Sequence, residues 1–485
     1  MSSLNFKPTQ EQLDIVEAFK TTRVLKVNAC AGSGKTSTLK LLAAENKQPS
    51  LLMAFNKAIA DEAAKQFPAH VSCRTMNSVA FAEFGSKLQH KLNFNKNPKL
   101  NTLRSIKNIV DWFSLGDYGM ATPEISARVI AAMARDTVDR FCHSSREEIS
   151  ELDLYHKEFK ELSKSHNYDE QHLGKVIVNL AKLIWKERIN PISVAASTHD
   201  TYLKLWSLSN PKLNYDILYV DEAQDINACV LHVLQQQTCK VLYVGDQHQS
   251  IYAFRGATNA MKSIEAPTLY LSQSWRYGEK IAKVAETLLA KYKGVVKGNP
   301  NIKSKVRKVR GMKNYTMIFR TNSALLEQAE LLIDKGIKIS VEVNVPDLIR
   351  QINSAVALKR GEKPFHDSIS RFGNWYEMLE FAKESVETRR LVNIVERKDV
   401  KEFCALLEKA NTKGTTPDVI LTTAHKSKGL EFDNVIVADD FKFGTNDWLD
   451  IPEQEINLLY VACTRAKLNL QVPDIIEINM RTEEE

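Results

Sequence analysis

Short runs of apolar residues recur along the chain, and the longer segments between them have the spacing of amphipathic helices. The best runs predict buried strands at Val24–Asn28, Ser50–Phe55, Ile217–Val220, Val241–Val244, Tyr315–Phe319, Val419–Thr422 and Val435–Ala438. Strands that alternate with helices are typical of a parallel sheet with crossover helices. We therefore expect an α/β protein.

The predicted strands are unevenly spaced because two long segments lack runs of this quality. The first extends from about Phe84 to Pro191 and is helical in pattern. The second extends from about Asn344 to Asn411 and is helical and charged. The simplest interpretation is two similar sheet domains, each with an inserted helical subdomain.

Composition narrows the class of protein only slightly. The chain has 485 residues, 44% hydrophobic and 26% charged, with a net charge of +7, so a nucleic-acid partner is permitted but not required. The seven cysteines are odd in number and none has metal-site spacing, so we predict neither a disulfide framework nor a zinc site. No secretory signal or membrane-length apolar run is visible, so we expect a cytoplasmic protein with no membrane partner.

The first predicted strand leads directly into a glycine-rich segment, 29–36, which has the spacing of a phosphate-binding loop except that Ala29 replaces the first glycine. Glycines let the backbone approach phosphate oxygens, and the next helix points its positive end at them. Lys35 would reach the β- and γ-phosphates of ATP and Thr36 would hold Mg²⁺. The alternative is a glycine turn before a helix. The predicted nucleotide-binding residues of this loop are Ala31, Gly32, Ser33, Gly34, Lys35, Thr36 and Ser37.

A second strand, Ile217–Val220, ends in two carboxylates. Asp221 can bind Mg²⁺, and Glu222 can orient or deprotonate an attacking water. An acidic pair after a strand is usually a solvated strand end, but its position downstream of a phosphate-binding loop favours catalysis. Together the two motifs predict nucleotide hydrolysis.

These motifs and their neighbours resemble those of the UvrD/Rep branch of superfamily 1 helicases. The strongest similarity lies in segments 221–225 and 244–257. Other segments resemble the remaining motifs of the family in order: Thr9–Gln12, Ala54–Lys57, Thr75–Ser78, Leu271–Arg276, Arg320–Asn322, Thr423–Phe432 and Leu459–Lys467.

Within this branch, the sequences of segments Thr198–Trp206 and Gly245–Ala257 are most similar to those of the F-box DNA helicases. An F-box does not fit before Gln12, so ubiquitin-ligase assembly is not expected, and we expect a short bacterial or phage relative. Two departures bear on function. Asn77 replaces a histidine common in the family, and the segment between Arg320 and Thr423 is shorter than the usual regulatory subdomain, which puts autoregulation and duplex engagement in doubt.

The resemblance implies two RecA-like parallel-sheet domains of the P-loop NTPase class, each with a helical insertion, with ATP between them and the DNA strand across both. The expected divisions are 1–83 with 192–264 as the first domain, 84–191 as its insertion, 265–343 with 412–480 as the second domain, 344–411 as a short insertion, and 481–485 as a tail.

The resemblance also implies roles at the nucleotide. Arg276 and Arg465 correspond to the arginines that contact the γ-phosphate, and Gln249 to the residue that senses it. Gln12 corresponds to the adenine-reading glutamine. The implied catalytic residues are Lys35, Glu222, Gln249, Arg276 and Arg465.

The resemblance implies two further nucleotide contacts, and for each of them a role that does not involve the nucleotide is also considered. Tyr252 corresponds to a tyrosine near the base of the nucleotide, and Glu431 to a ribose contact. Ordinary packing and a solvated charge are the respective alternatives.

Single strands are gripped by basic grooves with aromatic stacking platforms. Phe55 and Phe254 match DNA-stacking positions of the family, whereas Trp275 matches an aromatic that stacks or only packs. The basic stretch Lys303–Lys313 could follow phosphates or be a solvated loop. The implied DNA-binding residues are Phe55, Asn56, Thr75, Asn77, Phe254, Arg320 and His425.

The expected function is therefore that of an ATP- and Mg²⁺-dependent 3′–5′ single-stranded DNA translocase. It would unwind duplex DNA or strip proteins from it in repair, recombination or replication. Expected partners are single-stranded and tailed duplex DNA, with replication, recombination or single-strand-binding proteins as candidates. The expected location is the cytoplasm of a bacterial or phage-infected cell, or the nucleus of a eukaryote. A nucleic-acid-stimulated ATPase switch, or an ATPase subunit of a nuclease or defence complex, is the alternative.

Overall fold

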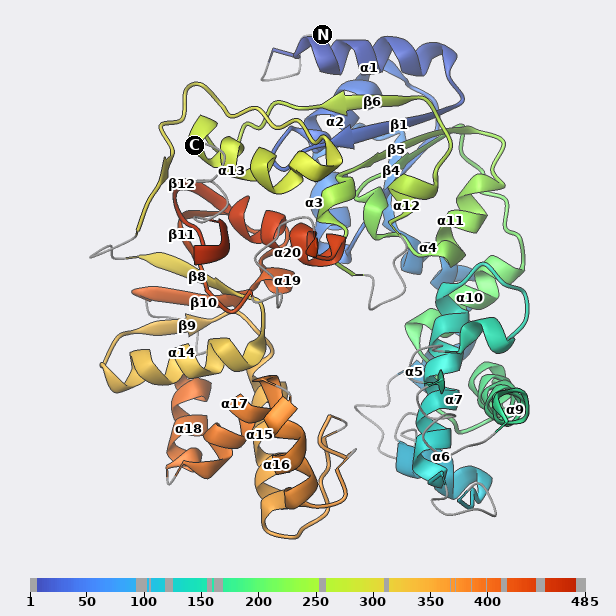
Figure 1. Ribbon diagram of the computed structural model, residues 1–485. Coiled ribbons are helices and arrows are strands. Elements are labelled where there is room, and N and C mark those ends of the chain that lie inside the picture. The colour runs from blue at the N-terminus through green and yellow to red at the C-terminus, as the bar shows by residue number, and fades with distance from the viewer. Residues whose placement is uncertain are drawn as a thin grey trace. The chain divides into compact units, whose positions relative to one another are not determined.

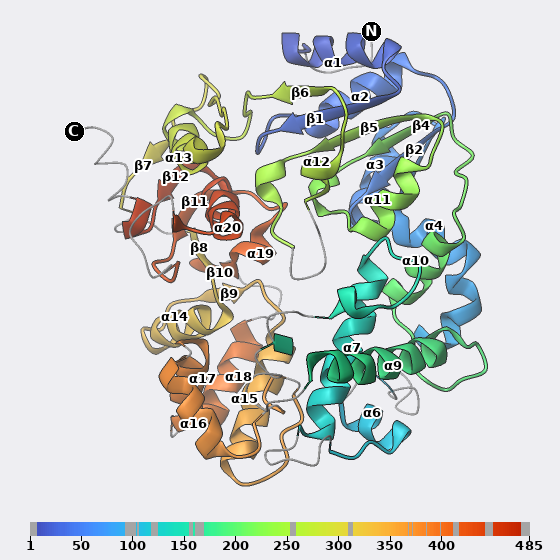
Figure 2. The ribbon, with the colours of Figure 1, turned by 45° about the vertical axis from the view of Figure 1, so that its right-hand side comes forward.

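The computed structural model describes residues 7–92, 103, 106–117, 125–154, 159–160, 169–252, 259–308, 314–366, 368–370, 372–384, 386–397, 399–410, 417–441 and 450–476. The chain divides into two compact units. The first comprises Met1–Ala29 and Lys35–Leu271, and the second comprises Cys30–Gly34 and Ser272–Glu485. Each contains one parallel sheet covered by helices (Figures 1 and 2).

The sheet of the first unit has the strand order β3-β2-β4-β5-β1-β6, and all of its pairings are parallel. Its strands are β1 (Val24–Ala29), β2 (Ser50–Ala54), β3 (Val71–Thr75), β4 (Ile217–Val220), β5 (Lys240–Gly245) and β6 (Thr268–Leu271). The sequence predicted the four inner strands to within one residue at each end. The two edge strands, β3 and β6, were missed.

Both faces of this sheet are buried, and consecutive residues of a strand contribute to opposite cores. In β4, Ile217 and Tyr219 join a core with α1 (Gln10–Thr21), α2 (Lys35–Glu45) and α3 (Lys57–Gln66). Leu218 and Val220 join the core on the other face. Its helices are α4 (Met76–Glu83), α10 (His199–Leu208), α11 (Ala228–Gln235) and α12 (Ala260–Ser263). This double burial explains why the inner strands are continuous apolar runs.

The segment after α4 is helical, as predicted. It contains η1 (Gly85–Leu88), α5 (Gln89–Leu92), α6 (Ile106–Phe113), α7 (Ala127–His143), η3 (Glu151–Asp153) and α9 (Glu170–Ile189). α6, α7 and α9 enclose their own apolar core, and α7 contacts α9 and lies beside it in both views (Figures 1 and 2).

A buried lysine closes the C-terminal end of α9. Lys91 is fully buried, and its Nζ donates to the backbone carbonyl oxygens of Glu187 at 2.8 Å, Arg188 at 3.0 Å and Asn190 at 2.6 Å. The last carbonyls of a helix have no intrahelical partner, and a cation near them is stabilising.

Replacing Lys91 by Met should leave these buried carbonyls without their donor, at a cost of about 1–3 kcal/mol. Amide hydrogen exchange of the last turn of α9, measured by mass spectrometry, should accelerate accordingly. The matched control is Lys182→Met, because Lys182 is exposed on the same helix. Equal exchange in both variants would contradict a capping role for Lys91.

The sheet of the second unit has the strand order β7-β12-β11-β8-β10-β9 and is also parallel. Its strands are β7 (Lys305–Val306), β8 (Tyr315–Phe319), β9 (Ile339–Val341), β10 (Val419–Thr423), β11 (Phe432–Val437) and β12 (Ala466–Gln471). β8, β10 and β11 were predicted, although β11 begins three residues earlier than expected. β7, β9 and β12 were not.

The predicted second helical segment forms α15 (Val345–Lys359), α16 (Trp375–Glu384), α17 (Val386–Glu396) and α18 (Val400–Ala410). These helices share one apolar core with β9, β10 and α14 (Asn322–Asp334). Of the four, α17 and α18 contact α14 and lie beside it in both views (Figures 1 and 2). Elsewhere in this unit, α13 (Glu279–Leu289) packs against α20 (Glu453–Cys463), which also contacts α19 (Ala424–Ser427).

The α/β fold with two parallel sheets confirms the predicted fold class. The predicted division at residue 264 stays a prediction, but β6 pairs with β1, so the first sheet continues to Leu271. None of the seven cysteines, all within the described ranges, forms a disulfide. No helix among the described residues is long and apolar enough to cross a membrane.

Candidate functional site

The phosphate-binding loop predicted from the sequence connects β1 to α2. Gly32 and Gly34 have φ angles of +78° and +84°, in the left-handed region that favours glycine. The hydroxyl group of Ser33 is buried, and no described residue forms a hydrogen bond with it. A buried hydroxyl costs free energy unless it is bonded, so the loop fits an oxygen-rich ligand such as a phosphate.

Lys35 is the first residue of α2, and its Nζ lies 3.0 Å from Oε1 of Glu222. Burial alone would lower the pKa of Lys35, but the carboxylates of Glu222, Asp221 and Asp246 outweigh it and raise the pKa. Lys35 is therefore a fixed positive charge at the start of a helix, held close to the acidic pair.

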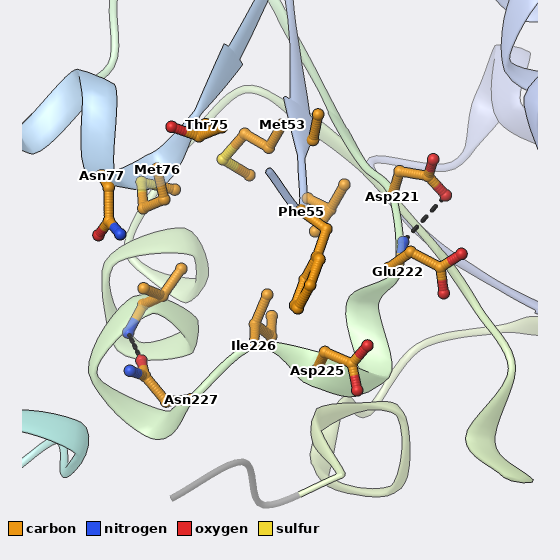
Figure 3. Close-up of a pocket in the computed structure, with 13 residues that line it drawn as sticks. Met53, Phe55, Thr75, Met76, Asn77, Asp221, Glu222, Asp225, Ile226 and Asn227 are labelled. Carbon is orange, nitrogen blue, oxygen red and sulfur yellow. Dashed lines mark hydrogen bonds between the residues drawn. The ribbon is translucent and has the colours of Figure 1, made fainter. Parts of the chain in front are cut away.

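Asp221 and Glu222 follow β4 at the carboxyl end of the sheet. Glu222 has φ +50° and ψ +42°, a left-handed conformation that is uncommon for a residue with a side chain. Its backbone N–H donates to Oδ1 of Asp221 at 2.9 Å (Figure 3). Burial, with the neighbouring Glu222 carboxylate, raises the pKa of Asp221 above its usual value, and Lys35 partly offsets the shift.

The short helix η5 (Gln247–Gln249) follows β5. Gln249 is buried, and its Nε2 donates to Oδ2 of Asp246 at 2.8 Å. The other Asp246 oxygen accepts from the backbone N–H of His248 at 3.0 Å. Gln249 thus lies in the same unit as Lys35 and Glu222, fixed by a buried carboxylate.

Gln12 lies in the first turn of α1 and is buried. Its Oε1 accepts from the backbone N–H of Thr9, and its Nε2 donates to Oγ1 of Thr38 on α2 at 3.1 Å. The predicted adenine-reading residue is thereby held against the helix that begins with Lys35. On the same helix, Thr36 is exposed and Ser37 is half-buried.

The predicted arginines of the second unit have protein partners in this structure. Nε of Arg276 lies 2.8 Å from Oε1 of Glu431, and its Nη1 donates to the carbonyl oxygen of Thr464 at 2.9 Å. Arg465 is buried, and its Nε donates to the carbonyl oxygen of Val461 at 2.9 Å. Arg276 and Glu431, both predicted nucleotide contacts, are thus brought together.

The loop segment Cys30–Gly34 groups with the second unit. The backbone N–H of Ala31 donates to the hydroxyl group of Tyr460 at 3.0 Å, and Oγ of Ser274 donates to the carbonyl oxygen of Ala31 at 2.8 Å. A Cβ atom on Gly32 would lie 2.7 Å from Cβ of Arg276. Glycine is therefore required at position 32 for two reasons: the backbone lies too close to Arg276 for a Cβ atom, and its φ angle is positive.

A pocket of about 160 Å³ opens at the carboxyl ends of β2, β3 and β4 (Figure 3). Its lining includes the acidic pair, Asp221 and Glu222. It also includes three of the predicted DNA-binding residues, which are Phe55, Thr75 and Asn77.

Two of the predicted DNA contacts begin helices beside this pocket. The side chain of Asn56 caps α3 by accepting from the N–H of Ile59 at 2.9 Å, and that of Thr75 caps α4 by accepting from the N–H of Ser78 at 3.1 Å. Helix N-termini attract anions such as phosphates.

The ring of Phe55 stacks on that of Tyr252, with centroids 5.8 Å apart and planes inclined by 13°. Phe55 is nonetheless 45% exposed. Tyr252, predicted near the nucleotide base, thus lies against a predicted DNA-stacking residue.

Phe55→Ala should weaken binding to single-stranded DNA by about 1–3 kcal/mol, because one stacking face is lost. The Kd should rise about 5- to 150-fold, while ATP hydrolysis without DNA should barely change. Fluorescence anisotropy with labelled single strands measures the first quantity. Tyr270→Ala is the control, because Tyr270 is 60% exposed on edge strand β6 of the same unit. An equal loss of affinity in both variants would refute the stacking assignment.

The other predicted DNA contacts lie elsewhere. Arg320 makes a two-pronged ion pair with Glu455, with N–O distances of 2.8 and 2.7 Å. His425 is half-buried on α19. Phe254 lies outside the described residues, as does part of the basic stretch Lys303–Lys313.

Sequence reasoning missed several partners of the predicted site residues. Gln224 and Asp246 connect Glu222 to Gln249, and Glu455 binds Arg320. Gln224 and Asp246 both lie inside segments already singled out as motifs, which was the available signal. Glu455 lies outside those segments.

A sequence model described as the UvrD/REP helicase N-terminal domain matches residues 8–265, and one described as the UvrD-like helicase C-terminal domain matches residues 418–472. The chain belongs to the UvrD/REP helicase family. The predicted family is thereby confirmed.

Two curated relatives are similar over nearly the whole chain. F-box DNA helicase 1 of Gallus gallus is 31% identical over 534 residues, which cover 97% of this chain and 49% of the relative. F-box DNA helicase protein 1 of Schizosaccharomyces pombe is 30% identical over 521 residues, which cover 96% of this chain and 57% of the relative. The chain thus spans about half the length of these relatives. Both support the predicted subgroup, and neither supports the predicted bacterial or phage source.

Proposed function

We propose that this chain is an ATP-driven motor that moves along single-stranded DNA in the 3′–5′ direction and unwinds duplex DNA or strips proteins from it. The observation that carries the proposal is the contact of Lys35 with Glu222 at 3.0 Å. It joins a phosphate-binding loop to a water-activating carboxylate in a chain of the UvrD/REP helicase family. The 3′–5′ polarity rests on the family resemblance alone.

The residues support ATP hydrolysis chemically. Lys35 would neutralise the β- and γ-phosphates, and Glu222 would accept a proton from the attacking water. Mg²⁺, when bound, would neutralise charge on the phosphate oxygens. Thr36 and Asp221 are the residues that would hold it, since a hydroxyl and a carboxylate are hard oxygen ligands. Mg²⁺ commonly takes only one or two carboxylates and completes its shell with water and phosphate oxygens.

The pocket supports DNA as the polymer. Phe55, Thr75 and Asn77 line the same pocket as Asp221 and Glu222, so a strand bound there would lie next to the hydrolytic residues. The relatives named as DNA helicases favour DNA over RNA. We propose repair, recombination or replication as the setting and proteins of these processes as partners. Because both relatives are eukaryotic, we propose the nucleus as its location.

The decisive experiment measures ATP hydrolysis with single-stranded DNA, duplex DNA and RNA, followed by strand displacement on duplexes tailed at the 3′ or the 5′ end. A motor of this kind should be stimulated most by single-stranded DNA and should unwind the 3′-tailed duplex. Stimulation by RNA alone, or unwinding from the 5′ tail alone, would contradict the proposal.

One observation favours a second candidate, a DNA-stimulated ATPase switch that does not unwind. The helices α15–α18 share a core with β9 and β10, so this short segment packs against the sheet of the second unit. If duplex engagement depends on a larger subdomain, the chain would hydrolyse ATP on DNA and leave every tailed duplex intact. The same strand-displacement assay separates the two functions.

A further inference from the structure

Gln224, for which the sequence predicted no role, has its side-chain amide beside the proposed catalytic carboxylate of Glu222. Gln224 is in η4 (Ala223–Asp225), two residues after Glu222, and its side chain is fully buried. Its Nε2 donates to Oε2 of Glu222, and its Oε1 accepts from the backbone N–H of Asp246 at 3.0 Å. Both ends of the amide are therefore used, one on the carboxylate and one on the end of the neighbouring strand.

The two oxygens of Glu222 have different partners. Oε1 lies 3.0 Å from Nζ of Lys35, and Oε2 accepts from Gln224. A carboxylate bound through both oxygens cannot rotate freely about its last bond. The backbone of Glu222 is left-handed, a conformation that persists only when surrounding contacts enforce it. Gln224 supplies one of these contacts.

The backbone of the next strand is shaped around this amide. A Cβ atom on Gly245 would lie 2.4 Å from Oε1 of Gln224 and 3.1 Å from the backbone nitrogen of Ala223. Only glycine allows β5 to end this close to η4. The following residue, Asp246, binds Gln224 through its N–H and Gln249 through its carboxylate.

We propose that Gln224 is a positioning residue that aims the Glu222 carboxylate at the attacking water and links it through Asp246 to Gln249. This inference rests on the proposed ATP hydrolysis. Glutamine suits the position because its amide donates on one side and accepts on the other. A side chain of the same length without these groups would remove a donor from Glu222 and the side-chain acceptor from the N–H of Asp246.

The test compares Gln224→Met and Gln224→Glu with the wild type in steady-state ATP hydrolysis. Gln224→Met should lower kcat about 10- to 100-fold, by analogy with the loss seen when the hydrogen-bond partner of a metal ligand is removed. The KM for ATP should stay within about threefold, since no group that binds phosphate is altered. Gln224→Glu keeps the shape but replaces the donor with a second carboxylate facing Glu222, so its loss should be at least as large. Gln171→Met, on the exposed surface of α9, is the matched control.

A double-mutant cycle then distinguishes positioning from a general structural role. If Gln224 acts through Glu222, Gln224→Met should change the single-turnover rate less than about twofold in a Glu222→Gln background. The proposal is overturned if Gln224→Met keeps kcat within twofold of wild type, or if it multiplies the Glu222→Gln defect by the same factor as in the wild type. A wild-type chain without ATP hydrolysis would instead refute the proposed function.

Discussion

Lys35→Ala is expected to abolish ATP turnover, with kcat falling by at least about 10²–10³, the loss typical of removing one electrostatic contact to a developing charge. Lys35 is held 3.0 Å from Glu222, and nearby carboxylates raise its pKa, so it is a permanent cation at the start of α2. Removing it leaves the phosphate charge without its compensation and Glu222 without its ion pair. Coupled-enzyme measurement of ATP turnover, with and without single-stranded DNA, should show the loss in both conditions.

Lys47→Ala is the matched control, because Lys47 is an exposed lysine shortly after α2 in the same unit. Circular dichroism should show that both variants keep the fold. Near-normal turnover in Lys35→Ala would mean that segment 29–36 is a glycine turn before a helix and not a phosphate-binding loop.

The strands that sequence reasoning found and those it missed differ in burial. The inner strands β1, β2, β4 and β5 lie between two cores and read as apolar runs. The missed edge strands β3 and β6 are mostly half-exposed, with a single buried residue in each. β12 is not at an edge, but one exposed and two half-buried residues separate its two buried ones. A search for continuous apolar runs therefore finds the centre of a doubly covered sheet and overlooks its borders.

At the candidate site, the sequence predicts the motif residues but not all of their side-chain partners. Lys35 and Glu222 are 187 positions apart by number, yet motif spacing alone was enough to predict a shared nucleotide site. The partners of Arg320 and Arg276 were not predicted: Glu455 lies outside every motif, and Glu431 was predicted only as a nucleotide contact. Their role depends on where α20 and the β10–β11 connection bring them. Side-chain pairing of this kind follows from packing and not from local pattern.

The second helical segment illustrates the same limit. The charged, periodic sequence of 344–411 correctly predicted helices, and α15–α18 are amphipathic. An amphipathic stripe says that one face is buried, but not against what. In the structure that face completes a core with β9, β10 and α14.

Glu222→Gln is expected to keep nucleotide binding while ATP hydrolysis falls about 10²- to 10⁴-fold, the usual contribution of a general base. The amide has the shape of the carboxylate but cannot accept a proton from water. It also carries no charge, so Lys35 loses its ion-pair partner and stays available to the phosphates. The variant should therefore hold ATP and remain tightly bound to single-stranded DNA.

Two measurements on one preparation test this expectation: equilibrium binding of a fluorescent ATP analogue, and single-turnover hydrolysis. Binding should stay within about threefold of the wild type while the hydrolysis rate collapses. Glu148→Gln, an exposed carboxylate in the first unit, is the control for loss of charge alone. Loss of binding in parallel with hydrolysis would assign Glu222 a structural role as the ion-pair partner that orders Lys35. Unchanged hydrolysis would mean that another carboxylate is the general base. Asp246, which is bonded to Gln249 and Gln224, would be the next residue to mutate.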